Sequence, residues 1–387
     1  MKQLLAMISI ALMMQLTAHA QDKATGSNVN VNIFSSSASH WYGIKDKHNV
    51  INPKKNQPRY KADQVEAIGD NILLYQKNNG GWSKNYDMTA ILTPDQKDSV
   101  KNDKANLNTT FDNSTSYTHV AYLAKAYNVT HAERFKAATV KGIDFILVAQ
   151  YANGGWPQYY PLEKGYSRHI TYNDDAYIGI MQLLRDIKNN DLAYNFLSAD
   201  VHKKVSSAFN KGIECILNTQ IKDKTGLTAW CQQHDEVTLK PTWARAFEMP
   251  SICSAESVGI VSLLMDLDKP SPQVINSVRQ AVKWFKSSAI KGIRIKTIAA
   301  APDTSQYTVS HSDRVVVQDS AAPQIWTRFY EIDTQRPLFC NRDSKLVYSL
   351  AEVARERRSG YAWYTYSPQK AIDRYPVWAK KWGVNEL

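Results

Sequence analysis

The stretch Asn79-Gly80-Gly81-Trp82 decides the fold, because it returns further along the chain as Asn153-Gly154-Gly155-Trp156. A third version, Gly226-Leu227-Thr228-Ala229-Trp230, follows at the same interval. The distance from the first tryptophan to the second is 74 residues, and from the second to the third it is again 74 residues. A glutamine ends the helical pattern shortly before each turn. Equal periods of this kind indicate a repeat architecture.

Each period has room for two helices of ordinary length and their loops. One segment per unit is strongly apolar, and we expect it to form an inner helix; these segments are 121–127, 178–187 and 258–267. The other is amphipathic, and we expect it to form the partner helix; these segments are 140–150, 205–220 and 274–287. Lys141-Gly142-Ile143 and Lys211-Gly212-Ile213 are expected to begin matching helices. The Gly-Gly-Trp turns also have a structural explanation, in which glycine ends a helix in the left-handed region and tryptophan packs beneath the turn.

Helical hairpins that each need a neighbour to bury their apolar face will stack. We therefore predict a mainly α fold, an α/α toroid of repeated helical hairpins. Minor β inserts are expected at 293–298 and 307–317, where β-branched residues alternate. The predicted organisation is a signal peptide at 1–20, a polar and irregular N-terminal arm at 21–60, and a single catalytic domain at 61–387.

The first twenty residues have the pattern of a secretory leader. Lys2 gives a positive start, an apolar run follows, and Ala18-His19-Ala20 is a small-x-small cleavage site. We predict cleavage after Ala20 and a secreted or periplasmic protein. The net charge of +11 favours a polyanionic partner. Because export makes nucleic acid a poor candidate, an acidic polysaccharide is favoured. Four cysteines in 387 residues exclude a disulfide-built fold, and buried free thiols are expected.

Charged residues recur at one point of the repeat, after the loop that follows each tryptophan turn. The first unit has Thr110-Phe111-Asp112-Asn113 there, the second has Tyr172-Asn173-Asp174-Asp175, and the third has 241–248, which contains Arg245. Equivalent positions in successive hairpins lie at the same end of the array. Two acidic clusters and an arginine are therefore expected to converge at one rim.

Two simpler interpretations stand beside this one. Aspartate, asparagine, serine and threonine are common helix N-caps, so each acidic cluster could only cap a helix. Arg245 could only form an ion pair with Glu248 on the same helical turn. The functional interpretation is a calcium site, since calcium takes oxygen ligands from aspartate, asparagine and water. The sequence contains no EF-hand loop, so ligands would come from distant segments.

Taken together, six ordered motifs resemble those of the polysaccharide lyase family 10 pectate lyases. The similarity extends from about residue 62 to about residue 363. The motifs are Asn79-Gly80-Gly81-Trp82, Thr110-Phe111-Asp112-Asn113, Gly154-Gly155-Trp156-Pro157-Gln158, Tyr172-Asn173-Asp174, Trp243-Ala244-Arg245-Ala246-Phe247-Glu248, and Arg328-Phe329-Tyr330-Glu331-Ile332 through Arg336-Pro337.

This resemblance implies a helical toroid-like domain that cleaves polygalacturonate by calcium-assisted anti β-elimination. It implies calcium ligation by Asp112 and Asp174, and Arg245 as the catalytic base. It also implies that Arg336 and Asn113 bind substrate. The implied base abstracts the C5 proton next to the uronate carboxylate, and the C4 oxygen leaves, giving 4,5-unsaturated oligogalacturonates. Because arginine has a pKa above about 12, an alkaline optimum is expected.

Three other functions remain open at this point. A glycoside hydrolase on the same scaffold would need two suitably spaced carboxyl groups. A terpenoid-cyclase-like enzyme is suggested by the tryptophan turns, but the chain lacks an Asp-Asp-x-x-Asp motif. A non-catalytic pectin-binding protein would keep the aromatics and the basic charge without turnover. The expected partner is polygalacturonate, with neither nucleic acid nor membrane, and the expected state is a monomer.

Overall fold

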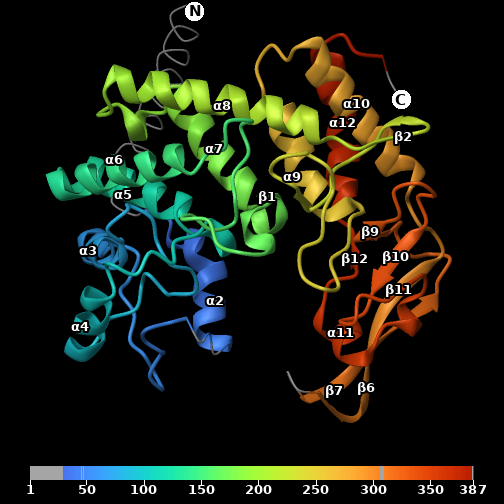
Figure 1. Cartoon of the computed structure of the whole chain (residues 1–387), viewed down its shortest axis with the longest axis horizontal. Coiled ribbons are helices and arrows are strands. Elements are labelled where there is room, and N and C mark those ends of the chain that lie inside the picture. The colour runs from blue at the N-terminus through green and yellow to red at the C-terminus, as the bar shows by residue number, and fades with distance from the viewer. Residues whose placement is uncertain (1–28, 45, 47, 306–308, 386) are drawn as a thin grey trace, which may run out of the picture.

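The helices account for most of the regular structure in the computed structural model, which describes residues 29–44, 46, 48–305, 309–385 and 387 (Figure 1). The α-helices are α2 (Ser35–Gly43), α3 (Val65–Tyr75), α4 (Pro94–Asn102), α5 (Tyr117–Thr130), α6 (Glu133–Val148), α7 (Ala176–Lys188), α8 (Ala199–Thr219), α9 (Ser254–Met265), α10 (Pro272–Ser287), α11 (Arg355–Gly360) and α12 (Pro368–Lys381). The fold is therefore mainly helical, as predicted.

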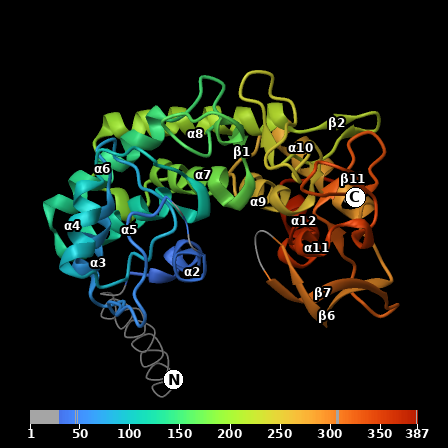
Figure 2. The same ribbon diagram turned by 60° about the horizontal axis from the view of Figure 1, so that its bottom comes forward.

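Three antiparallel hairpins form the body of the molecule, namely α5 with α6, α7 with α8, and α9 with α10. The inner helices pack in the order α3, α5, α7, α9 and α12. Figures 1 and 2 show them as a row, with α3 at one end and α12 at the other. The predicted stack of helical hairpins is confirmed, whereas closure of the row into a ring is not shown by the described helices.

The tryptophan turns hold successive helices together in the same way each time. The indole N–H of each tryptophan donates to a backbone carbonyl near the end of the preceding helix, and the ring is buried. The donor–acceptor distances are 2.9 Å from Trp82 to Ile72, 2.8 Å from Trp156 to Ile146, and 2.7 Å from Trp230 to Ile216. Trp326 makes the same bond to Phe285, at 2.8 Å. The repeat therefore has a fourth tryptophan that the 74-residue spacing did not reveal.

The two Lys-Gly-Ile sequences lie inside α6 and α8, so the expectation that they begin these helices is wrong. Their glycines instead make room for side chains of the inner helix and the tryptophan turn. A Cβ atom on Gly142 would lie 2.5 Å from Val120 and 3.1 Å from the Trp82 ring, and one on Gly212 would lie 2.4 Å from Met181 and 3.2 Å from the Trp156 ring. The glycine is therefore needed where these side chains pack against the helix.

Strands are short apart from one hairpin. They are β1 (Ile170–Thr171), β2 (Lys222–Asp223), β3 (Gly226–Leu227), β4 (Gln233–His234), β5 (Ile252–Cys253), β6 (Ile293–Thr304), β7 (Val309–Gln318), β8 (Trp326–Thr327), β9 (Phe329–Tyr330), β10 (Pro337–Cys340), β11 (Leu346–Val347) and β12 (Tyr364–Thr365). The predicted β inserts are confirmed as the antiparallel hairpin β6–β7. A four-stranded sheet in the order β11-β10-β9-β5 has its own buried cluster, which includes Phe247 and Phe329.

The N-terminal arm is more ordered than its polar sequence indicated. A 3-10 helix (Val31–Phe34) leads directly into α2, and Trp41 on α2 is buried against the main core. The expectation of an irregular arm is therefore wrong for this part, because Phe34 and Trp41 give it an apolar face to bury. The predicted leader at 1–20 lies outside the described residues. In the part of the chain that the structure describes, no helix has the length and apolar character needed to cross a membrane.

Candidate active site

Three segments occupy equivalent positions in the repeat, because each forms the same backbone hydrogen bond with a repeat tryptophan. Each tryptophan carbonyl accepts a hydrogen bond from the segment that leads into the next inner helix: Trp82 from Thr110 at 3.0 Å, Trp156 from Thr171 at 3.2 Å, and Trp230 from Cys253 at 2.7 Å. In the third unit, the segment equivalent to these two acidic segments therefore begins at Cys253. The expectation that 241–248 occupies this position is wrong, because that loop comes earlier and its first residue pairs with β4.

The two acidic segments form turns of the same shape. Asp112 lies in the 3-10 turn η2 (Asp112–Ser114), and Asp174 lies in η4 (Asn173–Asp175). Asn113 has a φ of 51° and Asp174 a φ of 53°, in the left-handed region that asparagine and aspartate tolerate better than most residues. The two turns pack against each other. The predicted convergence of the two clusters is therefore confirmed.

Helix capping does not explain these carboxylates. Asp175 occupies the N-cap position of α7, yet its side chain makes no capping hydrogen bond. The helix α5, which follows the first turn, is capped by Ser116 together with His119. Neither Asp112 nor Asp174 is the N-cap residue of a described α-helix. The aspartates are thus available for another role.

Two cations flank the acidic turns, and each lies two residues after a repeat tryptophan. Lys84 forms an ion pair with Asp112, and Arg328 forms one with Glu256 on the first turn of α9. Burial acts to lower the pKa of Lys84, but the charge of Asp112 outweighs it and the pKa is raised. Both cations therefore stay charged, and they can offset anionic groups at this site.

The carboxyl groups of η4 are held in an unfavourable electrostatic setting. Asp174 and Asp175 are exposed, yet the surrounding protein removes part of their hydration. This loss of hydration raises the pKa of Asp174, the charge of Asp112 raises it further, and Arg328 opposes the shift. Loss of hydration, followed by the charge of Glu256, also raises the pKa of Asp175. The four carboxylates of Asp112, Asp174, Asp175 and Glu256 thus outnumber the two cations, Lys84 and Arg328, and a metal ion would relieve the remaining repulsion.

Buried oxygen atoms without partners support the same conclusion. Asp112 accepts a bond from Lys84 through Oδ2, but its Oδ1 is buried and has no partner among the described residues. The same is true of Asn173 Oδ1 and of both polar atoms of the Gln232 amide. Unsatisfied buried acceptors are costly, so a ligand that binds them would be strongly favoured. Carboxylate and amide oxygens are the ligands that calcium prefers, and these residues fit that ion.

The guanidinium group of Arg245 forms an ion pair with Glu248. Its Nε donates to Glu248 Oε2 at 2.7 Å, a second guanidinium nitrogen bonds Oε1, and Tyr361 donates to the same oxygen at 2.8 Å. Burial acts to lower the pKa of Arg245, but the hydrogen bond and charge of Glu248 prevail and raise it. The structure thus shows the ion pair that the sequence offered as the simpler interpretation. The Arg245 side chain as a whole is about half exposed, and so can be reached from solvent.

Tyr166 connects the Arg245 loop with the acidic turns. Burial raises the pKa of Tyr166, while Arg245 and Lys84 both act to lower it and Asp112 acts to raise it. Tyr166 is therefore near enough to all three residues for their charges to act on it.

The two predicted substrate-binding residues are placed differently. Asn113 is buried, and its amide donates to Asn85 Oδ1 at 2.8 Å while its carbonyl accepts from Ser37 at 2.7 Å. Its side chain therefore supports the η2 turn. Arg336 lies in the turn between β9 and β10, is exposed, and has its guanidinium carbon 3.9 Å from the centre of the Tyr348 ring. Among the described residues, no hydrogen bond or ion pair joins Arg336 to the acidic turns.

Among the described residues, the closest approach of three metal-binding side chains is found outside the acidic turns. Ligand atoms of His169, Asp235 and Glu236 lie within 4.8 Å of one another. Glu236, however, already accepts from Arg168 at 2.5 Å and pairs with His169 at 2.8 Å. These contacts make the group an ion-pair cluster, and it has no unpartnered buried oxygen. The acidic turns remain the better candidate for calcium.

Sequence reasoning missed three residues of this site: Lys84, Glu256 and Arg328. A signal for the two cations was present, because each follows a repeat tryptophan by two residues. The long β6–β7 hairpin separates α10 from Trp326, so the fourth unit does not keep the period. Glu256 could be assigned to the site only from the structure, because the hydrogen bond from Cys253 to Trp230 shows that the start of α9 is equivalent to the acidic turns.

The fold is thus that of a helical-repeat protein, and carboxylates paired with cations form a charged site at its turns. Comparison with protein families matches residues 76–372 to the pectic acid lyase family. Since the match covers well over half of the chain, this protein belongs to that family and is a polysaccharide lyase.

Two solved structures are similar over most of the chain. One is the family 10 polysaccharide lyase from Cellvibrio cellulosa, with 27% identity, a TM-score of 0.67, and coverage of 93% of this chain and 99% of that one. The other is an aspartate-to-alanine mutant of a family 10 polysaccharide lyase from the same organism in complex with trigalacturonic acid. It has 29% identity, a TM-score of 0.69, and coverage of 83% of this chain and 93% of that one. No curated protein matches the chain significantly. The resemblance stated from the motifs is confirmed.

Proposed function

We propose that this protein is a secreted or periplasmic, calcium-dependent pectate lyase that cleaves α-1,4-polygalacturonate by anti β-elimination. The single observation that supports this most is the pair of acidic turns, with unpartnered buried oxygens, flanked by Lys84 and Arg328 in a chain of this family. The similar structure that holds trigalacturonic acid supports a galacturonate substrate. The net charge of +11 suits a polyanion.

Asp112, Asn173 and Asp174 would hold calcium, with Asp175 and Glu256 beside them. When bound, calcium supplies positive charge that neutralises the uronate carboxylate and so makes the neighbouring C5 proton more acidic. Lys84 and Arg328 are placed to add to this effect, because both are cations at the edge of the acidic turns. Stabilising charge that develops on the carboxylate is the largest contribution we expect from the protein.

Arg245 is the proposed base, accepting the C5 proton on a guanidinium nitrogen while the C4 oxygen leaves. In the paired state with Glu248 this arginine is protonated, since the pair raises its pKa. Turnover therefore requires the neutral form, which alkaline pH and nearby positive charge favour. Bound calcium would supply such positive charge, whereas the uronate carboxylates of the substrate carry negative charge. Arg336 and Asn113 are proposed to contribute to substrate binding, Asn113 by supporting the Asp112 turn.

The proposal is tested by adding the mature protein to polygalacturonate at alkaline pH, with calcium or with a chelator. The ultraviolet absorbance of the unsaturated uronate should rise with calcium and stay flat with the chelator. New reducing ends without that absorbance would mean hydrolysis and would contradict β-elimination. Binding without either signal would contradict turnover of this polymer. Amino-terminal sequencing of the exported protein should find Gln21 as its first residue.

Asp112→Asn should weaken the response to calcium. The substitution keeps the volume but removes the charge and one oxygen ligand, so we expect the calcium concentration for half-maximal activity to rise about 10- to 100-fold. Asp98→Asn is the matched control, because Asp98 is an exposed aspartate in α4 that pairs only with Lys101. An unchanged calcium response in Asp112→Asn would remove this residue from the metal site.

Calcium affinity should fall as the pH is lowered, earlier than for an ordinary carboxylate site. The raised pKa of Asp174 means that it holds its proton to higher pH, and calcium binds only the carboxylate form. Calorimetric titration at about pH 5 and about pH 8 should therefore show weaker binding at the lower pH, with proton release on binding. Asp174→Asn should lose most of this pH dependence. Equal pH dependence in both proteins would place the titrating group elsewhere.

A further inference from the structure

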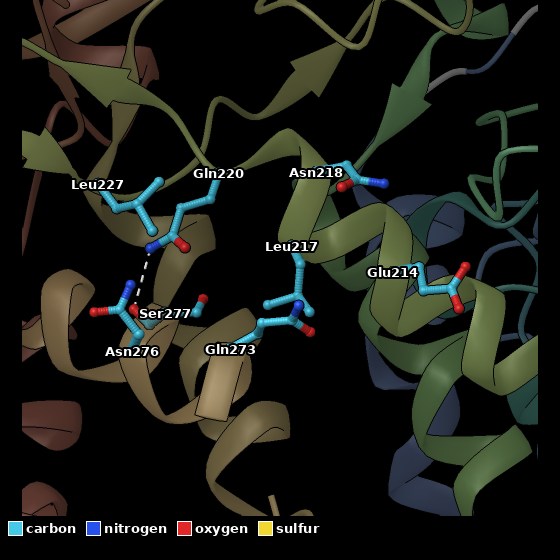
Figure 3. A pocket seen from close by; sticks show the side chains of 8 residues that line it. All are labelled: Glu214, Leu217, Asn218, Gln220, Leu227, Gln273, Asn276 and Ser277. Carbon is cyan, nitrogen blue, oxygen red and sulfur yellow. Dashed lines mark hydrogen bonds between the residues drawn. The ribbon is translucent and has the colours of Figure 1, made fainter. Parts of the chain in front are cut away.

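A cavity of about 440 Å³ lies between α8 and α10, the amphipathic helices of two successive hairpins (Figure 3). Its walls are the C-terminal half of α8, the N-terminal half of α10, and strand β3. A second cavity of about 300 Å³ shares Leu227 with the first and continues along α10 to Trp284. Volumes of this size are typical of small-molecule sites. Together the two make one groove, which we call the α8–α10 groove.

The groove lies where the third unit departs from the repeat. In the first two units the Gly-Gly turn lies directly on the next helix: a Cβ atom on Gly80 would be 2.4 Å from the Lys141 carbonyl oxygen, and one on Gly154 would be 2.0 Å from that of Lys211. The third unit has the hairpin β2–β3 instead, and Thr228 stands at the position of these glycines, two residues before the tryptophan. Leu227 of the hairpin lines both cavities.

Buried polar atoms at the base of the groove have no partner. Ser277 is 1% exposed and its Oγ makes no hydrogen bond with any described residue. Gln220 donates to the Thr228 and Ser277 carbonyls at 2.8 and 3.1 Å, but its Oε1 is buried and unpartnered. Trp284 Nε1, in the second cavity, is also unpartnered. Because buried donors and acceptors are nearly always satisfied, these atoms indicate a ligand that forms hydrogen bonds.

The rim carries side chains that can both donate and accept hydrogen bonds. Figure 3 shows Asn218 on α8 and Gln273 and Asn276 on α10 around the opening. An amide can donate two hydrogen bonds and accept two, which matches the hydroxyl groups of a sugar. Glu214 is the one charged residue of the described lining of the larger cavity, and Lys283 is the one charged residue of the described lining of the smaller cavity. A uronate in the larger cavity would face a carboxylate and no cation, and the described lining of the whole groove has one charge of each sign.

From these observations we propose that the α8–α10 groove binds an uncharged, hydroxyl-rich oligosaccharide segment. The inference is independent of the proposed lyase reaction, because it depends on the polar lining and the unpartnered atoms of the outer helices. Binding in this groove would hold neutral parts of a plant-type polysaccharide while the acidic turns act on uronate.

The test is calorimetric titration of the full mature protein with β-1,4-linked galactotetraose, with a chelator present to remove calcium. We expect one site with a Kd on the order of 1 mM. The double variant Gln273→Ala/Asn276→Ala should bind at least about tenfold more weakly, since it removes two exposed amides from the rim. Lys286→Ala is the matched control, because this exposed residue of α10 does not line the groove.

Circular dichroism and the activity on polygalacturonate should stay unchanged in the double variant, so that lost binding is not a consequence of unfolding. Ser277→Ala, which removes the unpartnered hydroxyl with almost no change in volume, should weaken binding in the same direction. Equal affinity of wild type and double variant, or no heat at a tenfold excess over the expected Kd, would overturn the proposal. If the double variant instead loses only trigalacturonate binding, the ligand is acidic and the neutral assignment is wrong.

Discussion

Arg245→Ala is expected to lower kcat on polygalacturonate by about 1,000-fold, within the range for loss of a general base, while calcium-dependent binding of substrate survives. The residue contacts Glu248, Tyr361 and Phe247, and no described hydrogen bond or ion pair joins it to the acidic turns. Its removal therefore leaves the proposed calcium ligands in place. An effect on kcat without an effect on calcium binding would assign Arg245 to the chemical step.

The measurement is single-turnover absorbance of the unsaturated product, combined with calorimetric binding of trigalacturonate in calcium. Arg245→Lys is an informative second variant, because it keeps the positive charge but loses the planar fork that pairs with Glu248. If Arg245→Ala retains most of its activity, this residue is not the base. If it loses calcium binding instead, its role is structural.

Glu248→Gln tests how the charge of Glu248 affects the proposed base, Arg245. The carboxylate of Glu248 is the reason that the pKa of Arg245 is raised, so its neutralisation should lower that pKa. Since the base must be neutral, the rise of activity with pH should move to lower pH in this variant. The burial of Glu248 means that the variant also loses stability, so activity is compared per folded molecule. A pH profile that does not move would separate the titration of Arg245 from catalysis.

Much of the helical framework could be predicted because it depends on local sequence rules repeated at a fixed interval. The turns at Trp82 and Trp156 contain glycines that a positive φ and a close approach to the next helix require, and the apolar and amphipathic segments that follow these turns match α5 to α8. The fourth unit could not be predicted, since the β6–β7 hairpin hides the position of Trp326. Order in the arm depends on a tertiary contact of Trp41, which no local pattern displays.

The site was predictable in part for the same reason. Asp112 and Asp174 occupy equivalent turns, so repetition alone brought them together. The partners of these residues were not predictable, because Arg328 reaches Glu256 across 72 positions of the sequence. For Arg245, local spacing favoured the ion pair with Glu248, and the structure contains it. Whether this arginine also acts as the base depends on the positive charge of a bound metal ion and on the position of the substrate, neither of which local spacing displays.

Gly154→Ala should cost more stability than any other single methyl group added to a repeat turn, about 4 kcal/mol or more. Two costs combine at this position. The backbone has a φ of 90°, which residues with a Cβ rarely adopt, and the new Cβ would lie 2.0 Å from the Lys211 carbonyl oxygen. That oxygen belongs to the backbone of α8, so it cannot move aside as a flexible side chain would. Relief requires the turn and α8 to separate.

Gly165→Ala isolates the first of these costs. Gly165 has almost the same φ, 91°, but nothing lies within 4 Å of a Cβ placed there. We therefore expect Gly165→Ala to cost only the backbone strain, about 1–3 kcal/mol. Denaturant unfolding followed by tryptophan fluorescence would compare the two free energies of unfolding. Because Trp156 follows the same turn, its buried indole should report any separation from α8. Equal losses in the two variants would show that backbone strain alone limits the turn, and that the close approach of Gly154 to α8 adds nothing to the stability of the repeat.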